Sequence, residues 1–448
     1  MALRQTERRV TPIPISRGHV EALSHDGRGI TRLNGKTVFI EGALPGEDVD
    51  FHVFRRRREY DEARIRDIHK KSIARVPPHC EHFGVCGGCV LQHLAPAVQI
   101  VSKQKTLLDN LKRIGGVQPQ VILSPLTGPV WGYRRRARLS VHRGHSQERV
   151  HVGFVEKHSK HITKTRRCET LHPKIGYLIE PLATLIETLS IVECIPQIEV
   201  AIGDHASVLV LRILSQPDIA DREKLSEFEQ THDLHFYLQP GNEDNSVPLN
   251  GERRQLDYSL SHSNVDITFE PSDFIQVNAE INQQLVRRAI EELQVEPQQR
   301  VLDLFCGLGN FTLPLARVAK EVVGIEGEPG LVSRARANAG RNGLTNIGFY
   351  RSDLFAGQND AAWLQQPYDR LLLDPPRAGA REILACLGSK LPLRIVYISC
   401  HPATLARDAG FLVHERGYQL LSAGVVDMFP HTAHVESMAV FMRAGSLA

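Results

Sequence analysis

Hydrophobic and polar residues alternate in short runs over the first 70 residues of the chain. The runs lie at 18–23 (GHVEAL), 36–40 (KTVFI) and 49–53 (VDFHV), and Gly, Pro, Asn and Asp residues separate them. Alternation with a period of two is typical of strands with one buried face, and short strands between turn residues indicate a small all-β barrel. We therefore expect an OB-like β-barrel over residues 1–75, with a boundary at Pro77-Pro78.

The spacing of apolar residues changes after this boundary. A helical pattern covers 95–113 and ends at Gly115-Gly116. From residue 268 onward, helical stretches alternate with continuous apolar runs, which lie at 300–304, 321–325, 370–373 and 395–398. Continuous runs are typical of strands buried on both faces, so we expect a doubly wound, Rossmann-like α/β domain with a parallel sheet over 266–448. The mixed signals between the two regions predict a central α+β domain over 76–265.

Charge is distributed unevenly along the chain. Residues 1–170 contain 31 Lys and Arg against 16 Asp and Glu, whereas residues 171–448 contain 23 against 35. A basic module of this size points to a nucleic acid, because each neutralised phosphate releases counterions. For a single run such as Arg55–Arg58, a solvated charged face is an equally good interpretation.

Nothing in the sequence indicates a membrane partner. No stretch approaches the ~20 consecutive apolar residues that span a bilayer. The N-terminal sequence MALRQTERRV also lacks the apolar segment of a signal peptide. We therefore expect a cytoplasmic protein, and we expect it to be a monomer.

Four of the eight cysteines are spaced as metal ligands. Cys80, Cys86 and Cys89 surround Gly87-Gly88, and Cys168 follows after 78 intervening residues. Thiolates so close together can bind a soft metal or an iron–sulfur cluster, and glycines let the backbone approach cluster sulfides. Structural zinc sites usually have two short ligand pairs, so the single triplet favours [4Fe-4S] over zinc, with free loop cysteines as the third possibility.

A glycine-containing loop follows the first apolar run of the C-terminal domain. In the sequence VLDLFCGLGNFT (301–312), glycines let a cofactor approach the end of the strand, and Glu326 at the end of the next run can accept ribose hydroxyls. Thr312 stands where a dinucleotide fingerprint has its third glycine, which disfavours a pyrophosphate. The pattern therefore indicates S-adenosylmethionine, with Asp353 after the third strand near the adenine.

The fourth strand ends in Asp374-Pro375-Pro376-Arg377. A D/N-P-P-aromatic tetrad at this place would indicate methylation of an exocyclic amine, but Arg377 replaces the aromatic residue. This favours methylation of carbon, which needs a nucleophile to activate the base. Cys400 follows the apolar run at 395–398 on the same sheet edge, where catalysis is a better explanation than a small packing residue.

Five sequence motifs together resemble the RNA uracil-C5 methyltransferases. They are SDFIQVN (272–278), DLFCGLGNF (303–311), DPPR (374–377), SCHPATLARD (399–408) and HTAHVE (431–436). Within this family, the chain most resembles the members that act on bacterial 23S ribosomal RNA and carry a TRAM barrel and a [4Fe-4S] cluster. In such relatives the helix near 95–114 packs on the catalytic domain.

The resemblance implies a role for each matching residue. The implied cluster ligands are Cys80, Cys86, Cys89 and Cys168. The residues implied around S-adenosylmethionine and the base are Gln276, Phe305, Asn310, Glu326, Asp353 and Asp374. Cys400 is implied as the nucleophile and Glu436 as the base. Close relatives often have Asn at position 353, and an ionised Asp353 can only accept hydrogen bonds, so we expect it to face an amino donor.

The expected reaction is methylation of an unpaired uridine in 23S ribosomal RNA. Cys400 would add to C6, the activated C5 would take the methyl group, and Glu436 would remove the C5 proton. Three alternatives differ in substrate or class. A tRNA uracil-C5 methyltransferase usually lacks the barrel and the cysteine triplet, and a non-catalytic RNA-binding protein would not need Cys400 and Glu436. A cytosine-C5 enzyme usually has a second cysteine beside the fourth-strand proline, which is missing here.

Overall fold

A computed structural model describes residues 15–143, 149–241, 245–356 and 361–444 of the chain. The N-terminal sequence MALRQTERRV lies outside these residues. The chain divides into two compact units. The first unit comprises Met1–His79, Cys89–Ser102 and His431–Ala433, and the second comprises Cys80–Gly88, Lys103–Pro430 and His434–Ala448.

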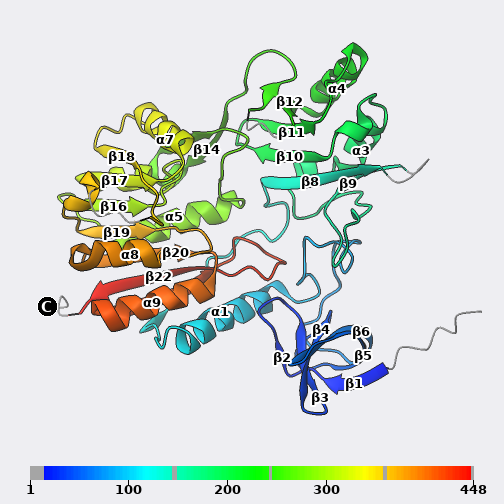
Figure 1. Ribbon diagram of the computed structural model, residues 1–448, viewed down its shortest axis with the longest axis horizontal. Coiled ribbons are helices and arrows are strands. Elements are labelled where there is room, and N and C mark those ends of the chain that lie inside the picture. Colours follow the sequence, from blue (N-terminus) through cyan, green and yellow to red (C-terminus); the bar gives the residue numbers. More distant parts are fainter. Residues whose placement is uncertain (1–14, 144–148, 242–244, 357–360, 445–448) are drawn as a thin grey trace, which may run out of the picture. The chain divides into compact units, whose positions relative to one another are not determined.

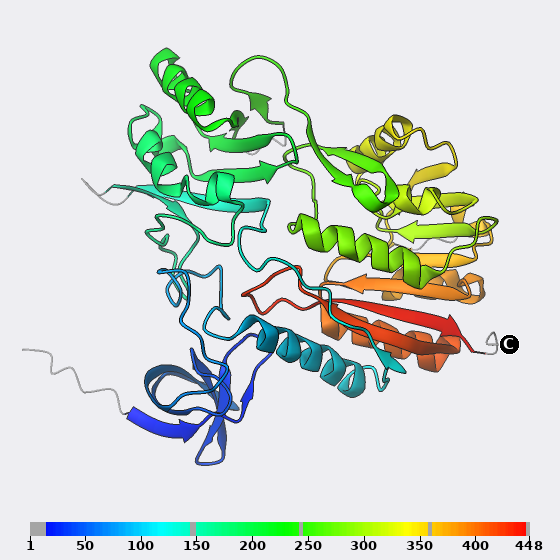
Figure 2. The same ribbon diagram turned by 180° about the vertical axis from the view of Figure 1, so that it is seen from behind.

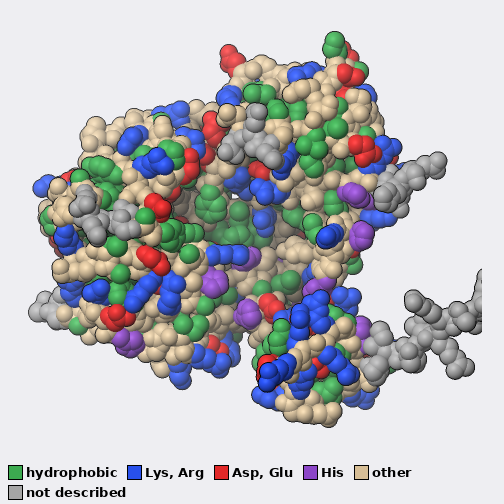
Figure 3. Space-filling view, viewed as in Figure 1, with side chains coloured by type: hydrophobic (Ala, Val, Ile, Leu, Met, Phe, Trp, Pro, Cys, Tyr) green, Lys and Arg blue, Asp and Glu red, His purple; other side chains and the backbone are tan. Residues whose placement is uncertain are grey.

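The first unit is built on a curled six-stranded sheet of order β1-β5-β6-β4-β3-β2, drawn in blue in Figure 1. Its strands are β1 (Ile15–His19), β2 (Ala22–Leu23), β3 (Gly29–Leu33), β4 (Lys36–Glu41), β5 (Asp48–Arg56) and β6 (Tyr60–Lys70). The alternating apolar residues point inward, and Val38, Ile40, Val49 and Phe51 are fully buried. Arg55–Arg58, in contrast, are exposed, and Lys and Arg side chains gather on the barrel surface (Figure 3).

The second unit contains a mixed six-stranded sheet of order β13-β12-β11-β10-β8-β9. Its strands are β8 (Arg136–Arg143), β9 (Val150–Gly153), β10 (Gln197–Ile202), β11 (Ser207–Ile213), β12 (His235–Pro240) and β13 (Val247–Pro248). The helices of this region are α2 (Pro173–Gly176), α3 (Ile179–Glu187), η1 (Val192–Cys194) and α4 (Ile219–His232). Apolar side chains of α3, α4 and the sheet form one buried cluster, which gives this part of the chain a core of its own.

The same unit contains an eight-stranded sheet of order β18-β17-β16-β19-β20-β22-β21-β7. Its strands are β7 (Val121–Ile122), β16 (Arg300–Leu304), β17 (Glu321–Glu326), β18 (Ile347–Arg351), β19 (Arg370–Leu373), β20 (Arg394–Ser399), β21 (Tyr418–Val426) and β22 (Glu436–Arg443). β16 to β20 run parallel, and β22 pairs antiparallel with both β20 and β21. The predicted doubly wound α/β domain is therefore confirmed.

Helices cover both faces of this sheet. The helices are α5 (Ala279–Leu293), α6 (Thr312–Ala316), α7 (Pro329–Arg341), α8 (Arg381–Leu387) and α9 (Pro402–Arg416), with η3 (Ala362–Gln365) and η4 (Gly388–Lys390). α8 and α9 lie in front of the sheet in Figure 1, and α5 lies in front of it in Figure 2. A hairpin of β14 (Leu256–Leu260) and β15 (Val265–Phe269), with η2 (Ser261–Ser263) in its turn, precedes α5.

The helix predicted over 95–113 is α1 (Pro96–Arg113). From Lys103 onward it belongs to the second unit, where Leu107 and Leu111 are buried. The Lys103 ammonium donates to Asp427 Oδ1 at 2.7 Å, and β7 pairs with β21 in the C-terminal sheet. The second part of the helix thus packs with the C-terminal sheet, as the resemblance implies, although sequence order places it in the central region.

The helices in the described part of the chain do not include a candidate membrane span. None of them combines the length and the apolar composition that crossing a bilayer requires.

Candidate active site

The loop after β16 has a backbone that few residue types can adopt. Phe305, Gly307 and Gly309 all have positive φ, at 65°, 54° and 93°. At Gly309 the positive φ favours glycine, and a Cβ atom would lie 1.9 Å from Leu313 Cδ1, whereas a Cβ at Gly307 would meet open space. The loop therefore presents bare backbone at the carboxyl end of the strand, which is where parallel sheets bind ligands.

The carboxylate of Glu326, at the end of β17, is held in place by backbone groups. Oε2 accepts from the Gly307 N–H at 3.1 Å, and Oε1 accepts from the Gly327 and Glu328 N–H groups at 2.7 and 3.1 Å. These bonds fix the orientation of a half-buried acidic side chain beside the glycine loop. Its remaining acceptor capacity can receive hydroxyl groups.

Asn310, the last polar residue of the loop, is fixed by two residues that sequence reasoning missed. Its amide exchanges two hydrogen bonds of 2.9 Å with Asn282 on α5, and its Oδ1 also accepts from the Tyr258 hydroxyl at 3.0 Å. The sequence offers one signal for Asn282: this residue lies near the start of the helix that follows the SDFIQVN motif (272–278). Tyr258 offers no such signal, because it reaches the loop from a distant hairpin.

Two acidic residues end neighbouring strands of the sheet. Asp303 on β16 is fully buried and accepts from the Thr312 hydroxyl at 2.5 Å, and burial raises its pKa to about 8. Asp374 directly follows β19, and burial raises its pKa to about 7. Gln276 Nε2 donates to Asp374 Oδ2 at 3.5 Å. Gln276 and Asp374, which were both predicted near the cofactor and the base, are therefore neighbours in the structure.

Cys400 and Glu436 lie on adjacent strands. Cys400 follows the last residue of β20, Glu436 is the first residue of β22, and the antiparallel register pairs Ser399 with Ser437. Burial, reinforced by the charge of Asp374, raises the pKa of Glu436 to about 8. The structure thus brings together the thiol and the carboxyl group that the sequence motifs predicted as partners.

The Cys400 thiol is half-buried, and its electrostatic surroundings are mixed. Burial, followed by the charges of Glu436 and Asp374, raises its pKa to about 11, although the charge of Arg377 lowers it. The positive neighbour that a nucleophilic cysteine needs is therefore Arg377. In the free protein the thiol holds its proton at neutral pH, since burial and the two carboxyl groups outweigh this one cation.

The other two residues expected around the cofactor lie at the same end of the sheet. Asp353 follows β18, is exposed, and accepts from the Phe355 N–H at 3.0 Å. The ring of Phe305 lies 5.8 Å from that of Phe355, measured between centroids. The six residues predicted around the cofactor and the base thus lie in one unit, together with Cys400 and Glu436. All of these eight residues except Gln276 lie at or after the ends of strands of the eight-stranded sheet.

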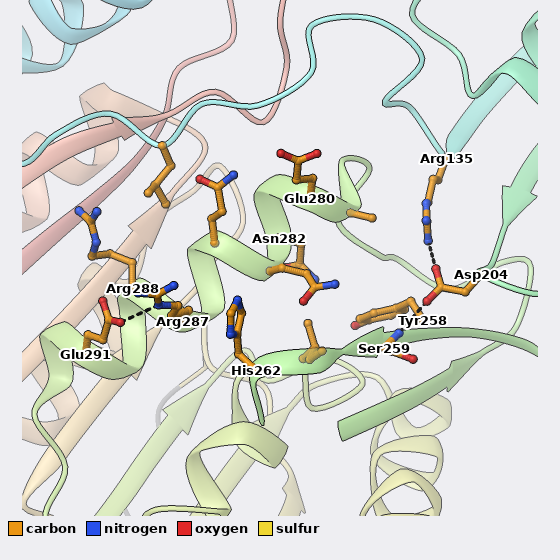
Figure 4. A pocket seen from close by; sticks show the side chains of 15 residues that line it. Arg135, Asp204, Tyr258, Ser259, His262, Glu280, Asn282, Arg287, Arg288 and Glu291 are labelled. Carbon is orange, nitrogen blue, oxygen red and sulfur yellow. Dashed lines mark hydrogen bonds and ion pairs between the residues drawn. The ribbon is translucent and has the colours of Figure 1, made fainter. Parts of the chain in front are cut away.

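A pocket of about 570 Å³ is lined by residues of α5 and of the hairpin that begins with β14 (Figure 4). Its wall includes Tyr258 and Asn282, the two residues that hold Asn310, together with three arginines. Two of these are paired with acids: Arg287 with Glu291, and Arg135 with Asp204. The pocket thus lies beside the residues that hold Asn310, and its lining does not include Cys400 or Glu436.

The predicted cluster ligands are distributed over both units. Cys80, Cys86 and Cys168 belong to the second unit, and Cys89 to the first. The pKa of Cys80 is raised by burial and by the charges of Cys168 and Cys86, so these three thiols are electrostatic neighbours. Within the described ranges, no three His, Cys, Asp or Glu side chains gather as a group that could hold a metal ion.

Comparison with known proteins gives matches over nearly the whole chain. Residues 96–444 match the tRNA (uracil-5-)-methyltransferase family, and residues 19–65 match the TRAM domain. The chain is 53% identical over 425 residues to the 23S rRNA (uracil(1939)-C(5))-methyltransferase RlmD of Alkalilimnicola ehrlichii, covering 95% of this chain and 96% of that protein. The protein of the same name from Xanthomonas campestris pv. campestris is 52% identical over 422 residues, covering 94% and 95%.

A solved structure shares the fold. It is the crystal structure of the tRNA (uracil-54, C5)-methyltransferase of Pyrococcus abyssi in complex with S-adenosyl-L-homocysteine. The TM-score is 0.72 at 24% sequence identity, and the match covers 95% of this chain and 99% of the other.

Proposed function

The chain belongs to the tRNA (uracil-5-)-methyltransferase family and carries a TRAM domain, and from this premise we propose that it methylates C5 of a uridine in 23S ribosomal RNA. The observation that carries the proposal is the placement of Cys400 and Glu436 on adjacent strands, with Asp374 close enough to affect the pKa of both. The choice of 23S RNA rests on the relatives that are about half identical over almost the entire chain.

Uracil C5 needs activation, because this carbon is a weak nucleophile. Cys400 Sγ bonds to C6, and the electrons of the C5–C6 double bond move onto C5 and O4. C5 takes up the methyl group that S-adenosylmethionine supplies when bound, and the electron pair of the broken sulfur–methyl bond stays on the sulfur of S-adenosylhomocysteine. Glu436 then accepts the C5 proton, the C5–C6 double bond re-forms, and the Cys400 thiolate leaves.

The residues around the glycine loop suit S-adenosylmethionine. Glu326, held by three backbone N–H groups, has acceptor capacity for the ribose hydroxyls, and Asp353 can accept from the adenine amino group. Phe305 offers an apolar ring beside Phe355. Gln276 and Asp374, which contact each other, would hold the base near Cys400.

The proton on Cys400 has a nearby destination. The thiol must lose this proton for the C6 bond to form. Asp374 and Glu436 both interact with it electrostatically, and each has a pKa close to neutrality, at about 7 and about 8. A carboxyl group in this range can accept a proton and release it again near neutral pH.

Recognition of RNA would involve the basic barrel. The exposed arginines 55–58 supply charge for phosphates, and the substrate uridine must be unpaired or leave its stack to reach Cys400. We further propose that Cys80, Cys86, Cys89 and Cys168 bind a [4Fe-4S] cluster. Its support is the thiol donor set, together with the mutual electrostatic influence of three of these cysteines.

A covalent trap tests the proposed reaction. The full-length protein is mixed with S-adenosylmethionine and 23S RNA fragments or tRNA that contain 5-fluorouridine. Fluorine at C5 blocks proton removal, so a denaturant-resistant adduct should form on the 23S fragment, and its peptide should map to Cys400. An adduct on tRNA alone would keep the chemistry and replace the substrate, whereas no adduct on either RNA would contradict the proposal.

The cluster is tested separately by composition. Protein purified without oxygen should contain about four iron and four sulfide ions per chain, which is the content of one [4Fe-4S] cluster. Cys80→Ser should lose most of this iron, and Cys194→Ser, which changes a half-buried cysteine of η1, should keep it. Zinc in place of iron and sulfide would overturn the cluster assignment without affecting the methyl-transfer proposal.

A further inference from the structure

One buried carboxylate ties the loop after β19 to the helix that follows Cys400. Asp408 on α9 is fully buried. Its Oδ2 accepts from the Ala380 N–H at 2.8 Å and from the Tyr397 hydroxyl at 2.7 Å. Tyr397 stands on β20, three positions before Cys400. Asp408 thus joins the nucleophile's strand, the following helix and the 374–380 loop, although the proposed chemistry does not use it.

Arg407 adds a second link between the same elements. Its Nε and Nη2 atoms both lie 2.8 Å from Asp408 Oδ1, and Nη2 also donates to the Ala378 carbonyl at 2.9 Å. A planar guanidinium that bonds a carboxylate and a carbonyl together fixes angles as well as distances. The side chain is 42% exposed, so it can be changed without opening a core cavity.

The loop passes Asp408 so closely that only glycine fits at position 379. Gly379 has φ of +84°, and a Cβ there would lie 2.6 Å from Asp408 Oδ2 and 2.7 Å from Arg407 Nη2. The fit shows that Arg407 and Asp408 contact the backbone of the loop directly. A displacement of the loop would therefore break these bonds.

The loop carries the two groups that influence the thiol in opposite directions. Asp374 raises the pKa of Cys400 and Arg377 lowers it, while Glu436 on β22 also raises it. Coulomb interactions depend on distance, so the position of the loop sets the balance between these three charges. The same balance governs how readily the thiol loses its proton.

We propose that Arg407 and Asp408 are positioning residues for methyl transfer, which hold the 374–380 loop so that Asp374 and Arg377 keep fixed positions beside Cys400. For the reaction itself this inference rests on the proposed function. The state of the Cys400 thiol, in contrast, can be measured in the free protein without RNA.

The test compares Arg407→Gln with Arg416→Gln. Arg416 is on the same helix, where its guanidinium lies over the Phe411 ring at 4.8 Å, and it makes a matched control. Two quantities are measured: steady-state methyl transfer, and the pH midpoint of Cys400 alkylation by iodoacetamide, followed on the Cys400 peptide. Gly379→Ala perturbs the same contact from the loop side. We use it in place of Asp408 variants, because a change of Asp408 would leave the buried Tyr397 hydroxyl and Ala380 N–H without their acceptor.

Arg407→Gln should lower kcat by about tenfold to a hundredfold, the range that follows from small misplacements of reacting groups, with KM for S-adenosylmethionine within about twofold. The alkylation midpoint should move by roughly half a pH unit or more, because charges beside the thiol have moved. Gly379→Ala should behave similarly. Arg407→Lys keeps the positive charge but cannot bond Asp408 and the Ala378 carbonyl with one planar group, so its kcat should lie between those of Arg407→Gln and the wild type. Arg416→Gln should match the wild type.

Wild-type kcat and an unmoved midpoint in Arg407→Gln would overturn the proposal. So would equal losses in Arg407→Gln and Arg416→Gln, because they would indicate a general effect on α9. Failure of the proposed function is distinguishable: the wild-type protein would then not methylate 23S RNA, while the midpoint would still move in Arg407→Gln and support the positioning of the thiol.

Discussion

Ser399 at the end of β20 pairs with Ser437 on β22, and this register sets Cys400 beside Glu436. The two residues lie on antiparallel neighbours in a sheet whose other central strands are parallel. The Cys400 thiol at the end of β20 and the Glu436 carboxyl group at the start of the adjacent strand β22 can act on C6 and C5 of one uracil ring.

Replacing Glu436 should trap the covalent intermediate. In Glu436→Gln the C5 proton cannot be accepted, so with unmodified 23S RNA we expect a protein–RNA adduct and a loss of turnover of about a hundredfold or more. Gel electrophoresis under denaturing conditions measures the adduct. Cys400→Ala should form none while retaining S-adenosylmethionine binding, and Cys386→Ala on α8 is the control expected to behave as wild type.

Activity should rise with pH through the range in which Glu436 ionises. Its pKa is about 8, well above the ordinary value for a glutamate, and only the ionised form accepts a proton. Below this pKa we therefore expect kcat/KM to increase about tenfold per pH unit, levelling off above it. A profile that is flat between pH 6 and 8 would contradict Glu436 as the group that titrates.

A methyl group at Gly309 should weaken cofactor binding. The added Cβ would lie 1.9 Å from Leu313 Cδ1, so this side chain must shift, and the positive φ at position 309 strains the loop backbone of any residue other than glycine. We expect Gly309→Ala to reduce affinity for S-adenosylhomocysteine by about tenfold or more, as misplacement of a binding loop commonly does. Isothermal titration calorimetry measures this. Gly340→Ala on α7, where a Cβ meets open space, should bind normally and stabilise the helix by about 0.5–1 kcal/mol.

Asp303 should make the free protein less stable as pH rises. Its pKa is about 8 in the folded chain and about 3.9 when unfolded, so only the unfolded state ionises between these values. The contribution is fully present below about pH 4 and is lost as pH rises towards about 8. The melting temperature of Asp303→Asn should therefore fall less between pH 5 and 8, by roughly 5 °C.

The control for this measurement is Asp109→Asn, which changes a half-buried aspartate on α1 that is paired with Lys105. It should show the same pH dependence of the melting temperature as the wild type. Equal falls in Asp303→Asn and in the wild type would show that Asp303 is not the carboxyl group responsible.

The local elements and the candidate reacting groups could be predicted from the amino-acid sequence alone. Continuous apolar runs at 300–304 and 395–398 predicted buried parallel strands, because burial on both faces removes the alternation of an exposed sheet. Alternation over the first 70 residues likewise predicted the barrel. Cys400, Glu326 and Asp374 could be singled out because each immediately follows or ends such a strand.

The distant residues that support these groups could be found only from the folded chain. Tyr258 and Asn282 hold Asn310 from two other elements, and Asp408 bonds a loop that lies 28 positions earlier in the chain. These contacts depend on strand order and register, whereas hydrophobic periodicity reports only the environment of each segment. The pKa values near neutrality have the same origin, because burial of a carboxyl group is a property of the packed sheet and not of its sequence neighbours.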